Sequence, residues 1–158
     1  MEVVMSVCMK AISGDEHVAD VASPLFALVE FYKAFNSRDL ELMKANWAQT
    51  GDVSMANPLG GVKLGWWALE GVYSRIFDGP AEVFVEFYDY VVQRSGSMFC
   101  VAGRERGRFR LGDQELALAI RTSRSYQFLG GRWQQIHHHG SIDDPDMLAA
   151  YQGALGLR

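Results

Sequence analysis

The stretch that decides the fold of this chain is Phe128-Leu129-Gly130-Gly131-Arg132-Trp133-Gln134-Gln135-Ile136-His137-His138-His139. It joins a glycine turn to an expected strand that carries three of the four histidines. Successive side chains of a strand face opposite sides of the sheet, so His138 points away from His137 and His139. One face therefore receives a single imidazole, and the face that lines a pocket decides where chemistry can occur.

Three more segments with the two-residue period of strands precede this stretch, starting at Ala81. Turn sequences separate them, at Ser95-Gly96, Leu111-Gly112-Asp113-Gln114 and Leu129-Gly130-Gly131. The pattern predicts a four-stranded antiparallel meander with strands of about 12 to 15 residues, against a usual five or six. Strands this long must coil and bend, so the sheet has a hollow face.

The first part of the chain has the pattern of helices. Ser23-Pro24 is a helix start, and the helix is expected to run to Phe35. Further helices are expected at about 39–47, at 66–77 and from Asp144-Pro145. The alternating segment 52–56, ended by Pro58 and a glycine pair, predicts a short strand at a sheet edge.

Composition narrows the class of protein. With 158 residues and 49% apolar content, the chain suits one domain, expected at 22–158 after an N-terminal extension at 1–21. A net charge of −4 with scattered basic residues disfavours nucleic-acid binding, and no apolar run is long enough to cross a membrane. Cys8 and Cys100 are too few for a disulfide framework, which favours a reduced, cytoplasmic setting.

Helices followed by a strongly curved sheet predict an α+β cone, with four long strands and a short one covered by three N-terminal helices. This order resembles the nuclear transport factor 2-like (cystatin-like) superfamily, its SnoaL-like group above all. Ala102-Gly103-Arg104, Thr122-Ser123-Arg124-Ser125-Tyr126 and the stretch from Trp133 to His139 also resemble the association domain of calcium/calmodulin-dependent kinase II. The resemblance covers about residues 22–142 and implies a ligand cavity, in a fold that hosts isomerases, cyclases, dehydratases, hydrolases and non-catalytic modules.

One side of the third long strand is expected to face that cavity. Its side chains form an apolar row interrupted by one arginine: Leu116, Leu118, Ile120, Thr122, Arg124, Tyr126 and Phe128. A guanidinium is expensive to bury alone, so Arg124 needs an acidic partner, a bound anion or an open cavity. Glu86, Asp89 and Glu105 are the candidate partners. The resemblance favours a ligand role, because association domains have an arginine at the place of Arg124.

On the last strand, the resemblance implies that Gln134, Ile136 and His138 face inward and that Trp133, Gln135, His137 and His139 face outward. His138 is then the pocket histidine, a candidate proton shuttle whose pKa the nearby Arg124 lowers. The alternative is a hydrogen-bonded core histidine. The resemblance also implies a homodimer through the outer sheet face, with His137 and His139 in the interface. Two histidines without a third ligand give no metal site, and we expect no cofactor.

Further candidates for ligand contact are spread over the elements. They are Phe31, Phe35, Trp47, Trp66, Asn57, Arg104, Tyr126 and Ile136. The alternative for the aromatic residues is the core, and for the run Arg104, Arg106, Arg108, Arg110 it is a solvated face.

The chain departs from the catalytic relatives that it resembles. Asn57 stands where ketosteroid isomerases have their basic aspartate, Phe31 stands where they have a tyrosine, and Gly140 stands where association domains have an arginine. Two hypotheses follow. Either the chain is a small enzyme of isomerase, cyclase or dehydratase type that acts on a hydrophobic carbonyl- or carboxylate-bearing molecule, with Arg124 and His138 as catalytic groups, or it is a non-catalytic ligand-binding or association module.

Overall fold

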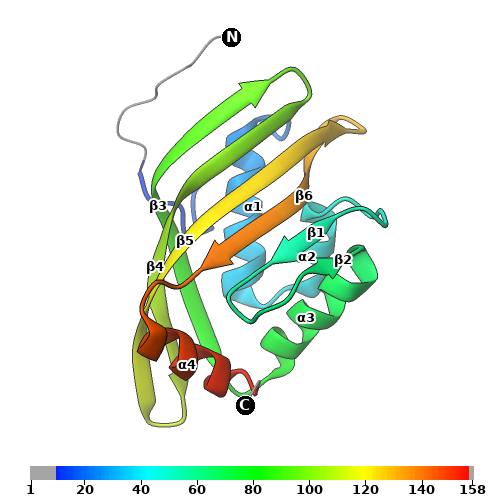
Figure 1. Ribbon diagram of the computed structural model, residues 1–158. Coiled ribbons are helices and arrows are strands. Elements are labelled where there is room, and N and C mark those ends of the chain that lie inside the picture. The colour runs from blue at the N-terminus through cyan, green and yellow to red at the C-terminus, as the bar shows by residue number, and fades with distance from the viewer. Residues whose placement is uncertain (1–9, 157–158) are drawn as a thin grey trace.

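The computed structural model describes residues 10–156 and places a curved six-stranded sheet against helices (Figure 1). The elements in chain order are α1 (Pro24–Ser37), α2 (Leu40–Asn46), β1 (Ser54–Ala56), β2 (Lys63–Leu64), α3 (Trp66–Asp78), β3 (Glu82–Ser95), β4 (Met98–Leu111), β5 (Gln114–Leu129), β6 (Arg132–Ser141) and α4 (Pro145–Ala154). The α+β class, the curved sheet with its four long strands and the covering helices are confirmed.

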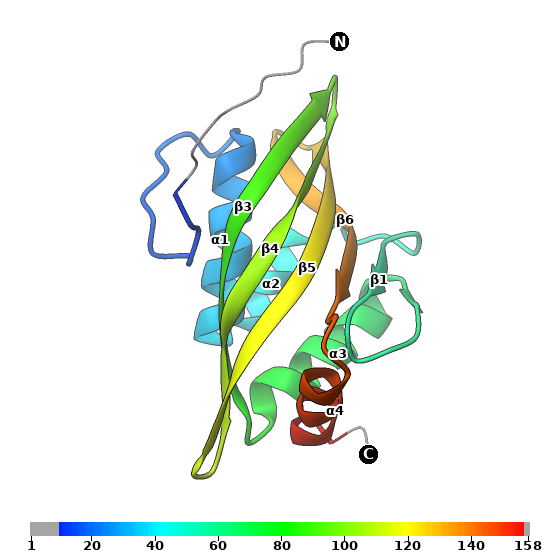
Figure 2. The same cartoon turned by 60° about the vertical axis from the view of Figure 1, so that its left-hand side comes forward.

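The helical hairpin forms where the capping residues predict it. The Ser23 hydroxyl accepts a hydrogen bond from the Phe26 amide at 3.1 Å, and Pro24 occupies the first helical position. Arg38 ends α1 in the left-handed conformation (φ 58°), and the Asp39 carboxylate then caps α2 by accepting from the Leu42 amide at 2.9 Å. The chain therefore reverses within two residues, and both helices lie on the concave face of the sheet (Figure 2).

The strand order corrects one expectation. The sheet runs β2-β1-β6-β5-β4-β3, with β1 parallel to β6 and every other pair antiparallel. The predicted short strand is present as β1, but its expected place at the sheet edge is wrong, because the two-residue strand β2 pairs with β1 and takes the edge. The glycine pair at 60–61, in left-handed backbone conformations, lets the chain turn back and add that last strand.

The curvature of the sheet comes from a bulge in β3. Its pairing with β4 shifts register between Tyr88 and Val91, and Asp89 has a left-handed backbone (φ 49°). Gly103 of β4 lies opposite, where an added Cβ would be only 2.5 Å from the Tyr90 Cβ. The bend therefore needs a residue without a side chain at position 103.

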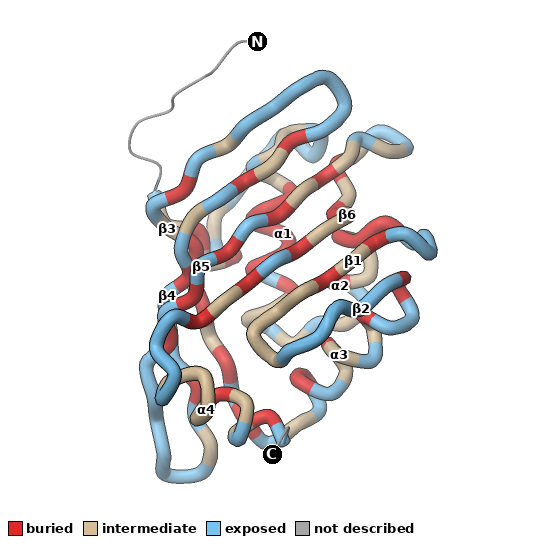
Figure 3. The backbone as a smooth tube through the Cα atoms, in the orientation of Figure 1, coloured by how far each residue is buried: buried red, intermediate tan, exposed pale blue. Residues whose placement is uncertain are grey.

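Burial alternates along the long strands, as Figure 3 shows. The inner side chains form an aromatic core with Phe87, Phe99, Tyr126 and Trp133, packed against the helices. Helix α4 lies at one end of the sheet, where Tyr151 contacts Phe109. Of the expected N-terminal extension, residues 1–9 with Cys8 lie outside the described part, whereas buried Ile12 pairs with Phe87 of β3 through two hydrogen bonds of 2.8 Å.

Candidate functional site

A cavity of about 40 Å³ lies between the concave face of the sheet, α1, α3 and α4. At roughly 10 to 15 Å³ for each water molecule, it has room for about three waters. Most of its wall is apolar. The polar or titratable side chains that reach it are Asn57, Tyr73, Glu105, Arg124, His138 and Tyr151.

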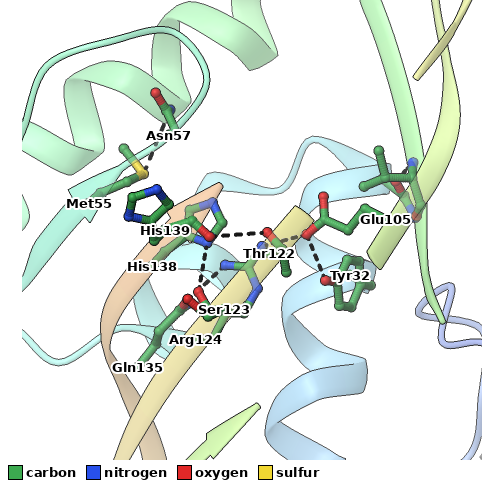
Figure 4. A network of polar contacts seen from close by, with 12 residues as sticks. Tyr32, Met55, Asn57, Glu105, Thr122, Ser123, Arg124, Gln135, His138 and His139 are labelled. Carbon is green, nitrogen blue, oxygen red and sulfur yellow. Dashed lines mark hydrogen bonds and ion pairs between the residues drawn. The ribbon is translucent and has the colours of Figure 1, made fainter. Parts of the chain in front are cut away.

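Arg124 lies at the inner wall of this cavity and is 2% exposed. Its Nη2 donates to Glu105 Oε1 at 3.1 Å, and its Nη1 donates to Gln135 Oε1 at 2.8 Å (Figure 4). The Phe31 ring covers the guanidinium, with its centroid 3.5 Å from Cζ. Of the three candidate acidic partners, Arg124 therefore pairs with Glu105, and not with Glu86 or Asp89.

Glu105 is also buried and is held by a second donor. The Tyr32 hydroxyl donates to Glu105 Oε1 at 2.8 Å, so this oxygen accepts two hydrogen bonds. Burial raises the pKa of Tyr32 well above its usual value, which keeps the hydroxyl protonated as a donor. The ion pair has no net charge, and hydrogen bonds from Tyr32 to Glu105 and from Arg124 to Gln135 hold it in place.

Two buried donors of cavity-lining residues, Tyr73 OH and Arg124 Nε, lack a hydrogen-bond partner within residues 10–156. Burial raises the pKa of Tyr73 to about 12, so its hydroxyl keeps its proton at neutral pH. Buried polar groups in proteins are nearly always hydrogen-bonded, and an unpaired one marks a place where water or a ligand binds.

His138 faces the cavity as predicted and is 7% exposed. Its Nδ1 lies 3.3 Å from the Ser123 carbonyl oxygen, which can only accept, so Nδ1 carries the proton and Nε2 keeps a free lone pair. Burial, followed by the Arg124 charge, holds the pKa of His138 well below 6.5. The imidazole is therefore neutral at physiological pH and able to accept a proton through Nε2.

Gly140 makes room for this imidazole. A Cβ at position 140 would lie 3.2 Å from His138 Nε2 and 3.2 Å from Pro58 Cδ. A side chain at position 140 would therefore compete with the imidazole for the same space.

The other predicted ligand contacts divide into two groups. Phe31, Phe35 and Asn57 line the cavity. The remainder are not among its lining residues in the described chain: Trp47, Trp66 and Tyr126 are core side chains, Ile136 is partly buried, and Arg104 is on the outer face. Arg104 forms an exposed ion pair with Asp89 at 3.3 Å, because its strand turns Glu105 inward instead.

The expected facing of β6 is correct for His138 and wrong for Trp133 and Gln135. The β5–β6 pairing shifts register between Ser125 and Tyr126, which leaves Ile136 as an extra residue on β6. Trp133 and Gln135 consequently face inward at 1% and 0% exposure, and the inward places expected for Gln134 and Ile136 are lost. Beyond the bulge His138 faces inward, and His137 and His139 lie on the outer face.

Sequence reasoning missed Tyr73 and Tyr151 as lining residues, and Gln135 and Tyr32 as the groups that hold the ion pair. A signal for Glu105 exists: it is the one charged residue in the inward row Phe99, Val101, Gly103, Glu105, Gly107, Phe109 of β4. That row mirrors the lone Arg124 of β5. The tyrosines are on helices, where spacing alone does not separate cavity from core.

Residues 10–156 contain no cluster of three or more histidine, cysteine or acidic side chains that could hold a metal ion. Within that range, no helix has both the length and the apolar character that a membrane crossing needs.

Comparisons with known proteins place the fold in a family. A model of the SnoaL-like domain matches residues 25–145, and the chain belongs to this family. A comparison with curated protein sequences finds no match.

Solved structures show the same fold. A ketosteroid isomerase-like protein from Erwinia carotovora atroseptica is 20% identical, with a TM-score of 0.65 over 83% of this chain and 99% of that one. A protein described as a dehydratase of the nuclear transport factor 2-like family, from Streptomyces avermitilis, is 22% identical, with a TM-score of 0.67 over 77% of this chain and 94% of that one. A third structure, described as a calcium/calmodulin-dependent kinase II association domain from Thiobacillus denitrificans, is 24% identical, with a TM-score of 0.64 over 82% of this chain and 100% of that one. The resemblance to these groups is confirmed, and at such identities it shows the fold alone.

Proposed function

We propose that this chain binds a small organic molecule in the cavity and that His138 accepts a proton from it, as in an isomerase, cyclase or dehydratase. The observation that supports the proposal is the neutral, buried imidazole whose free Nε2 shares a cavity with the Arg124–Glu105 pair. A general base needs a lone pair within reach of its substrate and a site that excludes bulk water. His138 meets both conditions.

The arrangement of charge suits proton transfer. A proton taken up by His138 would make an imidazolium next to Arg124, and the two positive charges repel. The imidazolium would therefore be a strong acid that returns its proton quickly to another atom of the bound molecule. In an isomerisation the proton returns to another carbon or oxygen of the same molecule, and in a dehydration it goes to the departing hydroxyl, so that the C–O bond breaks and water leaves.

Hydrogen–deuterium exchange tests this function without knowledge of the full reaction. Small ketones incubated with the protein in deuterated buffer should exchange the protons next to the carbonyl faster than in buffer alone, measured by proton NMR. His138→Gln should slow this exchange by about 10²- to 10⁴-fold, the usual contribution of a general base. His139→Gln, on the outer face of the same strand, is the matched control. Equal exchange rates in the two variants would contradict the role of His138.

The second candidate function is a non-catalytic ligand-binding or association module, with a homodimer through the outer sheet face. One observation favours it: Asn57 cannot replace a basic aspartate. Binding of a small molecule without any proton exchange would select this function. A reducing, cytoplasmic location remains part of the proposal for either candidate.

A further inference from the structure

The charge of the cavity limits which molecules it can hold. Glu105 and Arg124 are its only charged lining residues in the described chain, and they neutralise each other across 3.1 Å. His138 adds no charge at neutral pH. A carboxylate bound here would bring an uncompensated negative charge into a buried site next to Glu105, and burial of an unpaired charge is strongly unfavourable.

Arg124 is also poorly placed to serve a carboxylate in the usual two-pronged way. Nη1 is engaged by Gln135, Nη2 is engaged by Glu105, and Phe31 covers a face of the guanidinium. Its Nε is buried without a partner and can still donate. A carboxylate that used Nη2 would compete with Glu105, whose Oε1 accepts from both Arg124 and Tyr32.

Tyr73 supplies a second free donor in the same cavity. Its ring lies on α3 and is 3% exposed, and its hydroxyl has no partner within residues 10–156. Tyr73 lines the same cavity as Arg124 and Glu105. Tyr73 OH and Arg124 Nε can thus both offer a hydrogen to an oxygen atom that enters the cavity.

We propose that the ligand is uncharged and presents a carbonyl oxygen to the Tyr73 hydroxyl and Arg124 Nε. This inference rests on the proposed function and specifies its substrate class: small neutral carbonyl compounds, with carboxylates excluded. The two donors would stabilise the negative charge that develops on the oxygen when His138 removes a proton from the adjacent carbon. The C–H bond breaks, its electron pair becomes the enolate, and the proton moves to His138 Nε2.

Three probes of nearly equal size test whether the cavity prefers uncharged ligands: butanone, propionamide and propionate. Their binding is measured by ligand-observed NMR titration of the full chain at neutral pH. Butanone and propionamide should bind at least about 10-fold more tightly than propionate, because only propionate brings an unpaired charge. Tighter binding of propionate would overturn this inference and leave the proposed small-molecule site standing. Failure of all three probes to bind would contradict both.

The variant Tyr73→Phe tests where the oxygen binds. It should weaken butanone binding by about 3- to 10-fold, the range for one lost hydrogen bond. Its melting temperature should stay the same or rise, because the hydroxyl that it removes has no hydrogen-bond partner within residues 10–156. Tyr126→Phe is the matched control, since that hydroxyl donates to Asn46 Oδ1 at 3.4 Å and not to the cavity. Unchanged butanone affinity in Tyr73→Phe would overturn the assignment.

Discussion

Arg124 illustrates how a buried charge is made tolerable. Taking two ions out of water costs several kcal/mol for each, and their attraction offsets this only with good geometry and further hydrogen bonds. Here Gln135, Tyr32 and Phe31 supply those contacts. Removal of one partner would leave the other charge unpaired, at a cost of about 3–5 kcal/mol. A single change at Arg124 or Glu105 therefore affects folding as well as ligand binding, and changes at Tyr73 or His138 are cleaner probes.

His138 should make the stability of the protein depend on pH. Its pKa in the folded state lies well below the 6.5 of an exposed histidine, mainly through burial. Below about pH 6.5 the unfolded chain binds a proton that the folded chain does not, so the free energy of unfolding decreases as pH falls towards the folded pKa. We expect a loss of up to about 1.4 kcal/mol per pH unit from this group, measured by urea unfolding between about pH 7 and pH 5.5.

The variant His138→Gln should flatten this dependence, because glutamine does not titrate. Part of the slope should remain, since burial also lowers the pKa of His137. His139→Gln, at an exposed neighbour, is the control and should keep most of the slope, because burial of His138 is unchanged in it. An unchanged slope in His138→Gln would mean that other groups cause the pH dependence.

Single residues of the site were predictable where the two-residue period holds. The inward positions of Arg124 and His138 follow from alternation and from the resemblance, and both are correct. The sequence alone does not select the partner of Arg124 among the three acidic residues. The bulge in β3 and the alternation of side chains along β4 decide which of them faces inward. Tyr73 gave no signal, since a tyrosine on a buried helix face has the same pattern whether its hydroxyl is paired or free.

At the level of elements, the bulges shape the site. The extra residue Ile136 lets Gln135 and His138 face the same side of the sheet. The strand β6 therefore supplies both the hydrogen-bond acceptor for Arg124, Gln135, and the proposed base, His138. A shift of one residue moves every later side chain to the other face. The strands and their turns were predictable from alternation and glycine positions. A bulge has no comparable pattern in a single sequence, and this is why Trp133 and Gln135 were placed on the wrong face.

Gly103 should be essential for the bend of β3 and β4. An added methyl group would lie 2.5 Å from the Tyr90 Cβ and 2.9 Å from the Tyr90 Cα, and backbone atoms cannot move aside cheaply. Gly103→Ala should lower the free energy of unfolding by about 1–3 kcal/mol, the usual cost of overpacking, measured by urea denaturation. Gly71→Ala is the opposite control, because that helical glycine faces open space and alanine favours a helix by up to about 1 kcal/mol. Equal stability of the two variants would contradict this account of the bend.

At the scale of the whole molecule, the outer sheet face has two unlike halves. Over β3 and β4 it is charged, with exposed pairs Arg104–Asp89, Arg106–Glu86 and Arg110–Glu82. The four arginines from Arg104 to Arg110 therefore form a solvated face, which was the alternative to a ligand contact. Towards β1 an uncharged row crosses four strands through Cys100, Ser125, His137 and Ser54, and these residues are half-buried even in the single chain.

The uncharged row is the part of the outer face that suits a homodimer, because charged residues are depleted in the cores of interfaces. We expect multi-angle light scattering at micromolar concentration to give twice the chain mass of 17.7 kDa. Ser125→Glu places a charge in the middle of the row and should return the mass to that of one chain, because two such charges would meet across a two-fold axis. Ala117→Glu adds the same charge to an exposed outer position of the same strand, beside the arginines, and should leave the dimer intact. A monomer for the natural sequence would contradict the homodimer, and a dimer in Ser125→Glu would move the interface away from this row.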